Sequence, residues 1–164
     1  MALAAVDTDD LYQLFATYSH SLDLGDADAF AECFAEDGTL DTSQVEDGLA
    51  GLHRGRDELR RFARASLEYS RGRVRQSSLN VLLDGRGAHA RASSYVVVTR
   101  AHSDATNVHG QPSDAVNSVL ETTGMFFDEL GKIDGRWVFR TRVFRHDGLP
   151  EIVGRLSAPL VVGR

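Results

Sequence analysis

Two residues near the end of an N-terminal amphipathic segment, Tyr18 and Asp23, are the first candidates for chemistry. Tyr18 lies on the apolar stripe of that segment, so we expect a buried ring whose hydroxyl needs a hydrogen-bond partner. Asp23 follows the last residue of the stripe. A carboxylate at the mouth of an apolar cavity has a raised pKa and can act as a general acid or base. The competing interpretations are a core aromatic for Tyr18 and, for Asp23, a helix-end residue that bonds nearby backbone.

The segment 73–83 is a predicted strand that carries several polar side chains. Alternation places one set of residues on a single face: Val74, Gln76, Ser78, Asn80 and Leu82. A mixture of apolar, amide and hydroxyl groups suits a pocket wall, where a few polar groups orient a ligand. A solvent-facing strand is the alternative.

The predicted strand 136–145 carries an arginine that could face the core. Alternation gives two faces, one with Trp137, Phe139, Thr141 and Val143, the other with Val138, Arg140, Arg142 and Phe144. A core-facing Arg142 would be costly unless it were paired, and Asp23 or Asp128 could pair with it. The alternative is a surface arginine paired with an acid of a neighbouring strand. His146 ends the same strand, where a surface position is more usual than a catalytic one.

Several common kinds of site have no motif in this sequence. It contains no Gly-rich phosphate loop, no HExxH, no CxxC and no GxSxG. The histidines show no metal-ligand spacing, so we expect neither a metal nor a cofactor. Cys33 is interpreted as a small buried hydrophobe on a short helix rather than as a nucleophile.

Composition restricts the partners further. The chain of 164 residues has a formal net charge of −6, with its basic residues dispersed. This argues against nucleic-acid or membrane partners. No apolar run approaches the roughly 20 residues of a membrane span. The single cysteine fits a reducing compartment, so we expect a cytoplasmic protein.

The predicted elements place helices before strands. Asp7 is the expected N-cap of a helix over about 8–22, and Asp26 caps a short helix whose inward residues are Phe30, Cys33 and Phe34. A short strand near 39–42, a loop over 43–51 and a helix over 55–69 follow. The remaining strands are predicted at 73–83, 88–101, 116–130 and 136–145, with a hairpin turn at 84–87.

This order predicts an α+β fold shaped like a cone, with N-terminal helices packed on a curved, mostly antiparallel sheet. We expect one domain over 1–164, with a core of about 8–148 and a tail of 149–164. The long loop over 102–114 is typical of either a binding lid or a disordered segment.

Several stretches resemble the SnoaL-like proteins of the nuclear-transport-factor-2-like superfamily. They run in order through most of the chain: 18–30 with Tyr18, Asp23 and Asp26, then 34–38, 55–62, Asn80, 90–95, 124–130 with Phe126 and Asp128, and 135–142 with Arg142. The resemblance implies the cone fold and a homodimer. It also implies cofactor-free acid–base chemistry on a hydrophobic oxygenated small molecule such as a polyketide, steroid or aromatic.

The dehydratase-like branch of that family uses a Tyr and an Asp of the first helix and a His of the first long strand. Tyr18 and Asp23 match the first two, whereas Gln76 stands where the family has the His. We therefore expect Asp23 and Tyr18 to be catalytic, with ligand contacts from Gln76, Ser78, Asn80, Phe126, Arg142, His53 and His146.

The predicted function is a lyase, cyclase or isomerase of the dehydratase type. The missing His leaves alternatives open, because it removes the usual proton shuttle. One is a non-catalytic module that binds a small molecule or serves as a dimeric scaffold. The other is an accessory subunit of a ring-hydroxylating oxygenase.

Overall fold

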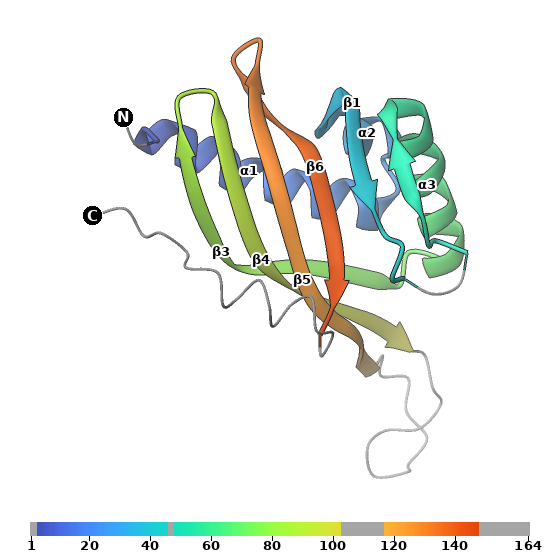
Figure 1. Cartoon of the computed structure of the whole chain (residues 1–164). Coiled ribbons are helices and arrows are strands. Elements are labelled where there is room, and N and C mark those ends of the chain that lie inside the picture. The colour runs from blue at the N-terminus through green and yellow to red at the C-terminus, as the bar shows by residue number, and fades with distance from the viewer. Residues whose placement is uncertain (1–2, 46–47, 103–116, 148–164) are drawn as a thin grey trace.

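The structure is a computed structural model that describes residues 3–45, 48–102 and 117–147. Its elements are α1 (Ala5–Leu24), α2 (Ala27–Glu32), β1 (Phe34–Asp41), β2 (Leu52–Arg54), α3 (Gly55–Ser70), β3 (Val74–Arg86), β4 (His89–His102), β5 (Asn117–Ile133) and β6 (Arg136–His146). Figure 1 shows one curved sheet with α1 crossing it and with α2 and α3 beside β1 and β2.

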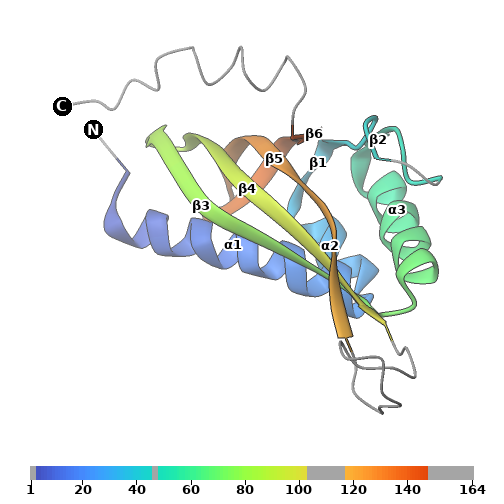
Figure 2. The same ribbon diagram turned by 90° about the horizontal axis from the view of Figure 1, so that it is seen from below.

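The sheet has six strands in the order β2-β1-β6-β5-β4-β3. All pairs are antiparallel except β1 with β6, which is parallel. Figure 2 shows α1 running along the sheet beside β3, the strand at one edge. The predicted α+β architecture, with N-terminal helices on a curved, mostly antiparallel sheet, is confirmed.

The apolar stripes of α1 and α3 are buried against this sheet. The buried set of α1 is Leu11, Leu14, Phe15, Tyr18 and Leu22, and that of α3 includes Leu59, Phe62 and Ala63. These residues recur at helical spacing, so each helix presents one apolar stripe to the sheet. The Asp26 side chain accepts a hydrogen bond from the Ala29 N–H at 2.9 Å, so the predicted cap of α2 is confirmed.

Two predicted boundaries are wrong. The first helix begins earlier than expected, and its N-cap is Ala4 rather than Asp7. Asp7 lies within the first turn, where its Oδ1 accepts hydrogen bonds from Lys132 at 2.6 Å and Trp137 at 2.9 Å. The strand expected near 39–42 begins at Phe34, because the parallel pairing with β6 extends it. Phe34 is therefore a strand residue.

Irregular pairing overturns the simple alternation predicted for two strands. In β3, Leu79 pairs with Tyr95 and Leu82 pairs with Ser93, so two residues of β3 lie opposite the single Ser94. Asn80, within this bulge, has a φ of 51°. A bulge shifts the alternation by one residue. Val74, Gln76 and Ser78 are partly buried before it, and Val81 and Leu83 after it, whereas Asn80 and Leu82 are exposed.

A similar shift in β6 brings together residues predicted on opposite faces. Leu130 pairs with Phe139, and the preceding Glu129 pairs with Thr141, so Arg140 has no partner of its own. Phe139 and Arg142 are consequently both buried.

The first hairpin turns later than the predicted 84–87, because Arg86 still pairs with His89. The predicted loop over 102–114 lies, apart from His102, outside the described residues. None of the helices in the described part of the chain is long and apolar enough to cross a membrane.

Candidate functional site

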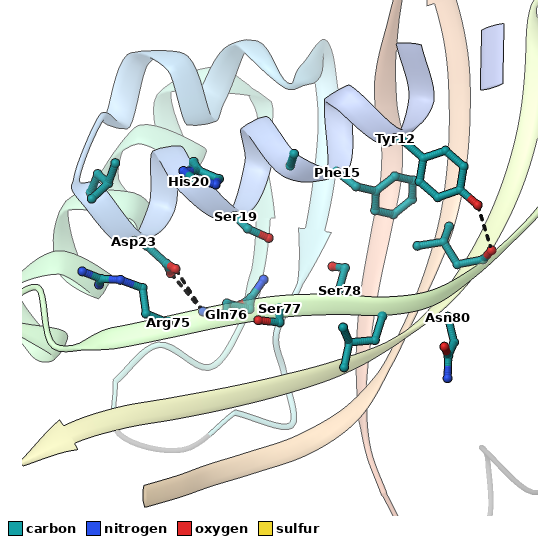
Figure 3. A pocket seen from close by; sticks show the side chains of 14 residues that line it. Tyr12, Phe15, Ser19, His20, Asp23, Arg75, Gln76, Ser77, Ser78 and Asn80 are labelled. Carbon is teal, nitrogen blue, oxygen red and sulfur yellow. Dashed lines mark hydrogen bonds between the residues drawn. The ribbon is translucent and has the colours of Figure 1, made fainter. Parts of the chain in front are cut away.

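A cavity of about 850 Å³ lies between α1 and the edge strand β3. It is an open slot along the edge of the sheet rather than the enclosed hollow that the cone fold suggested. Figure 3 shows the two walls facing each other. The lining residues are Tyr12, Phe15, Ala16, Ser19, His20, Asp23 and Leu24 of α1, and the consecutive residues 75–81 of β3.

Asp23 is the carboxylate of this slot. It is partly buried, and both of its oxygens accept from the Gln76 main-chain N–H, at 3.2 and 3.0 Å. Burial raises the pKa of Asp23, although the Gln76 N–H and the charges of Arg75 and His20 lower it. Asp23 therefore accepts a main-chain hydrogen bond, as expected of a helix-end residue. It also lies in a cavity wall with a raised pKa, as expected of a general acid or base.

The remaining polar groups of the slot come from both walls. Ser19 of α1 and Gln76 and Ser78 of β3 line it together with the apolar Phe15. The Ser78 hydroxyl accepts from Arg142 Nη2 at 3.3 Å, which connects the slot to the interior of the molecule. Gln76 and Ser78 therefore occupy the wall that the sequence predicted for them.

Arg142 fills the interior beneath the sheet. Its side chain is 0% exposed, and its guanidinium carbon lies 3.8–5.2 Å from the centroids of four aromatic rings, those of Phe126, Tyr18, Phe139 and Phe15. Cation–π contact of this kind offsets part of the cost of burying a charge. Arg142 and Phe126 thus contact each other in the core, and neither lines the slot.

Asp128 is the acid that faces Arg142. Its Oδ2 lies 3.5 Å from Arg142 Nη1, and its side chain is 0% exposed. Burial raises the pKa of Asp128 to about 7, even though the Arg142 charge lowers it. Within the described residues the two Asp128 oxygens, Arg142 Nε and Nη1, Ser94 Oγ and Gln76 Nε2 have no hydrogen-bond partner.

Tyr18 lies in the same interior rather than in the slot. It is 1% exposed and packs against Phe30, Phe34, Phe126 and Phe139. Burial raises the pKa of its hydroxyl to about 12, although the Arg142 charge lowers it. The hydroxyl is therefore neutral near pH 7.

The side chains of three other predicted ligand contacts do not face into the slot. Asn80 borders the slot, but its exposed side chain points away from α1 (Figure 3). His53 bonds the Thr42 hydroxyl at 3.0 Å and packs on a ring of α3. His146 bonds the Thr122 hydroxyl at 3.1 Å. Neither histidine is among the residues that line the slot.

Ser19 was not predicted as part of the site, and Asp128 was named from the sequence only as a possible partner of Arg142. Asp128 alternates with Phe126 and Leu130, both buried, so strand period alone could have placed it inside. Ser19 follows Tyr18 on α1, but no pattern in the sequence marked the slot. Among the described residues no group of three or more His, Cys, Asp or Glu side chains could hold a metal ion.

Comparison with known proteins gives one family and many similar structures. The family model of the SnoaL-like domain matches residues 4–143. No curated protein matches the chain. Among solved structures, Rv3472 of Mycobacterium tuberculosis, a protein of unknown function, is 27% identical with a TM-score of 0.69; the match covers 89% of this chain and 75% of that one.

Two further structures share the fold at lower identity. Aln2 from a Streptomyces species is 20% identical with a TM-score of 0.71, over 95% of this chain and 99% of that one. A scytalone dehydratase candidate from Novosphingobium aromaticivorans is 20% identical with a TM-score of 0.66, over 86% and 84% of the two chains.

Proposed function

Because the chain belongs to the SnoaL-like family, we propose that it is a cofactor-independent lyase, cyclase or isomerase acting on a hydrophobic oxygenated small molecule. The substrate classes that fit are polyketides, steroids and aromatic ketones. The family includes enzymes that move protons next to a carbonyl without a cofactor. The slot between α1 and β3 is the proposed site.

One observation carries the proposal: the Asp23 carboxylate lies in the wall of the slot with its pKa raised by partial burial. A raised pKa makes a carboxylate a stronger base, which suits proton abstraction from carbon. Phe15 gives the slot an apolar surface for a ring system, and the polar residues Ser19, Gln76 and Ser78 lie in its walls.

In the proposed reaction Asp23 takes a proton from the carbon next to a carbonyl. The electron pair of the broken C–H bond forms a C=C bond, and the carbonyl pair moves to oxygen. Asp23 then returns the proton. Return to another carbon gives an isomer, return to a hydroxyl on the β-carbon lets it leave as water and gives a dehydrated product, and return to the alkoxide formed when the enolate attacks a second carbonyl completes a ring closure. Arg142 supports the site from the interior through its hydrogen bond to the Ser78 hydroxyl.

The first step can be tested without knowing the substrate. 2-Tetralone, an aromatic ketone with acidic α-protons, exchanges them for deuterium in D₂O, and NMR measures the rate. We expect the protein to accelerate this exchange and Asp23→Asn to reduce the acceleration at least about 100-fold, within the usual contribution of a general base. Asp9→Asn, an exposed change on the same helix, is the matched control and should retain the wild-type rate.

The pH profile adds a second criterion. The acceleration should increase with pH as Asp23 ionises, with a midpoint above the ordinary aspartate pKa of 3.8. If Asp23→Asn exchanges 2-tetralone within a few-fold of wild type, Asp23 is not the base. A wild-type protein that binds 2-tetralone but does not exchange it would favour the non-catalytic binding module, which the replacement of the family His by Gln76 also supports.

We further propose a cytoplasmic homodimer. The outer face of β3 and β4 exposes Leu79, Leu82 and Tyr95, each about half exposed, and a second copy could cover them. Sedimentation of the wild type and of Leu82→Lys tests this, since a dimer should dissociate in the variant.

The free, buried Cys33 is consistent with a reducing compartment.

A further inference from the structure

The edge strand β3 presents main-chain groups to the slot. In an antiparallel pair, alternate residues direct both N–H and C=O toward the neighbouring strand or away from it. The Ala101 N–H donates to the Arg73 carbonyl at 2.8 Å, and β3 pairs with β4 in constant register up to Leu79. Arg75 and Ser77, two and four positions after Arg73, therefore form main-chain hydrogen bonds with β4. Gln76 and Ser78 consequently direct their N–H groups away from β4, toward the free edge.

Side chains of α1 contact this edge at two points. The Asp23 carboxylate accepts a hydrogen bond from the Gln76 N–H, so this N–H does point away from β4 and toward α1. Within the bulge, the Tyr12 hydroxyl donates to the Val81 carbonyl at 3.5 Å. Between these contacts lies Ser78, whose N–H has no hydrogen-bond partner among the described residues. Ser78 also lines the slot, and the strand alternation directs its N–H toward the free edge.

We propose that the Ser78 main-chain N–H is an oxyanion-binding donor, and that the slot takes enolisable carbonyl compounds whose oxygen accepts from it while the α-carbon lies at Asp23. This rests on the proposed function. Residues two apart on a strand have N–H groups about 6.8 Å apart. The Asp23 carboxylate occupies the first of these two positions, at Gln76. A C–C=O unit held between a base and a hydrogen-bond donor spans a similar distance.

The chemical role follows from this spacing. As Asp23 takes the α-proton, negative charge develops on the carbonyl oxygen, and the Ser78 N–H is fixed beside that oxygen before the reaction begins. A donor held rigidly by the sheet needs no reorganisation as the charge forms. The Arg142 bond to the Ser78 hydroxyl holds the residue from the other side.

The wild-type protein provides the first test. 2-Naphthol, a planar analogue of the enol of 2-tetralone, is added to the ¹⁵N-labelled protein, with naphthalene as the control that lacks the oxygen. We expect the Ser78 amide proton to move downfield with 2-naphthol and not with naphthalene. Equal responses to the two compounds would overturn the proposal.

Two variants at one position separate the N–H from the side chain. Ser78→Pro removes the N–H and the hydroxyl, whereas Ser78→Ala removes the hydroxyl alone. Proline is tolerated on an edge strand where its nitrogen faces away from the sheet. We expect Ser78→Ala to bind 2-naphthol within about threefold of wild type and Ser78→Pro to bind about tenfold more weakly, with naphthalene unaffected in either variant. Equal affinities of folded Ser78→Pro and Ser78→Ala for 2-naphthol would contradict the inference.

The two proposals can fail separately. If exchange of 2-tetralone depends on Asp23 but is the same in Ser78→Pro and Ser78→Ala, the oxyanion donor is wrong and the proposed function stands. If the wild type does not exchange 2-tetralone while the Ser78 amide responds selectively to 2-naphthol, the donor stands and the proton transfer is wrong.

Discussion

Asp128 and Arg142 lie directly opposite each other on β5 and β6, with Asp128 Oδ2 3.5 Å from Arg142 Nη1 and both side chains fully buried. The distance is long for a direct ion-pair hydrogen bond. Burial keeps the pKa of Asp128 near 7, so this carboxyl changes charge close to physiological pH. The pair lies behind the wall of the slot, which it reaches through the Ser78 hydroxyl.

Removing one member of this pair should cost more than removing both. Arg142→Met leaves a buried carboxylate without its partner, and we expect a loss of about 3 kcal/mol in the free energy of unfolding at pH 8. The double change Asp128→Leu with Arg142→Met should recover at least about 1 kcal/mol of that loss, because no buried charge remains. Urea denaturation measures both, and a double variant no more stable than Arg142→Met would contradict this prediction.

Stability should decrease with rising pH because of Asp128. Its folded pKa of about 7 lies above the ordinary value of 3.8, so the folded state binds the proton more tightly than the unfolded state. The stabilisation is complete below about pH 4 and is lost as pH rises through 7, by at most about 1.4 kcal/mol per pH unit. Asp128→Asn should lack this contribution.

The control for the pH experiment is Asp134→Asn, in the exposed turn between β5 and β6. Asparagine tolerates the positive φ of that position, so the change should leave the pH dependence of unfolding as in wild type. A pH dependence in Asp128→Asn identical to that of Asp134→Asn would rule out Asp128 as its source.

Asp7 should anchor the start of α1 to the β5–β6 hairpin. Hydrogen bonds from Lys132 and Trp137 lower its pKa, so its stabilisation is present above the ordinary value of 3.8 and is lost as pH falls through the lower folded pKa. Trp137 is the single tryptophan of the chain. We expect Asp7→Ala to shift its fluorescence emission to longer wavelength and to lower the melting temperature, while Asp9→Ala, without these partners, leaves the emission unchanged.

The bulge in β3 should depend on the conformation of Asn80. Its φ of 51° is accessible to glycine and asparagine but strained for a β-branched residue. We expect Asn80→Val to lower the free energy of unfolding by about 1–2 kcal/mol and Asn80→Gly to leave it within about 0.5 kcal/mol. Thermal denaturation compares the two, and equal losses would show that the backbone conformation is not the cause.

The sequence by itself determined the order of the helices and strands and part of one wall of the slot. Helical stripes, the Asp26 cap and strand alternation depend on neighbours within a few residues, so Tyr18 and Phe30 were predicted to be buried, and Gln76 and Ser78 to share one face. The Asp23 position at the end of a buried stripe also follows from local spacing.

Only the tertiary structure decided which groups meet. The bulge in β3 turned the Asn80 side chain outward. In β6, Arg140 has no partner residue on β5, and this brought Phe139 and Arg142 to the same side of the sheet. Local sequence does not specify either irregularity, because a bulge depends on pairing with another strand. The partner of Arg142 was left open between two acids and proved to be Asp128. The free edge of β3 is likewise a property of strand order, which local sequence does not specify, and that order places Gln76 and Ser78 in the same slot as Asp23.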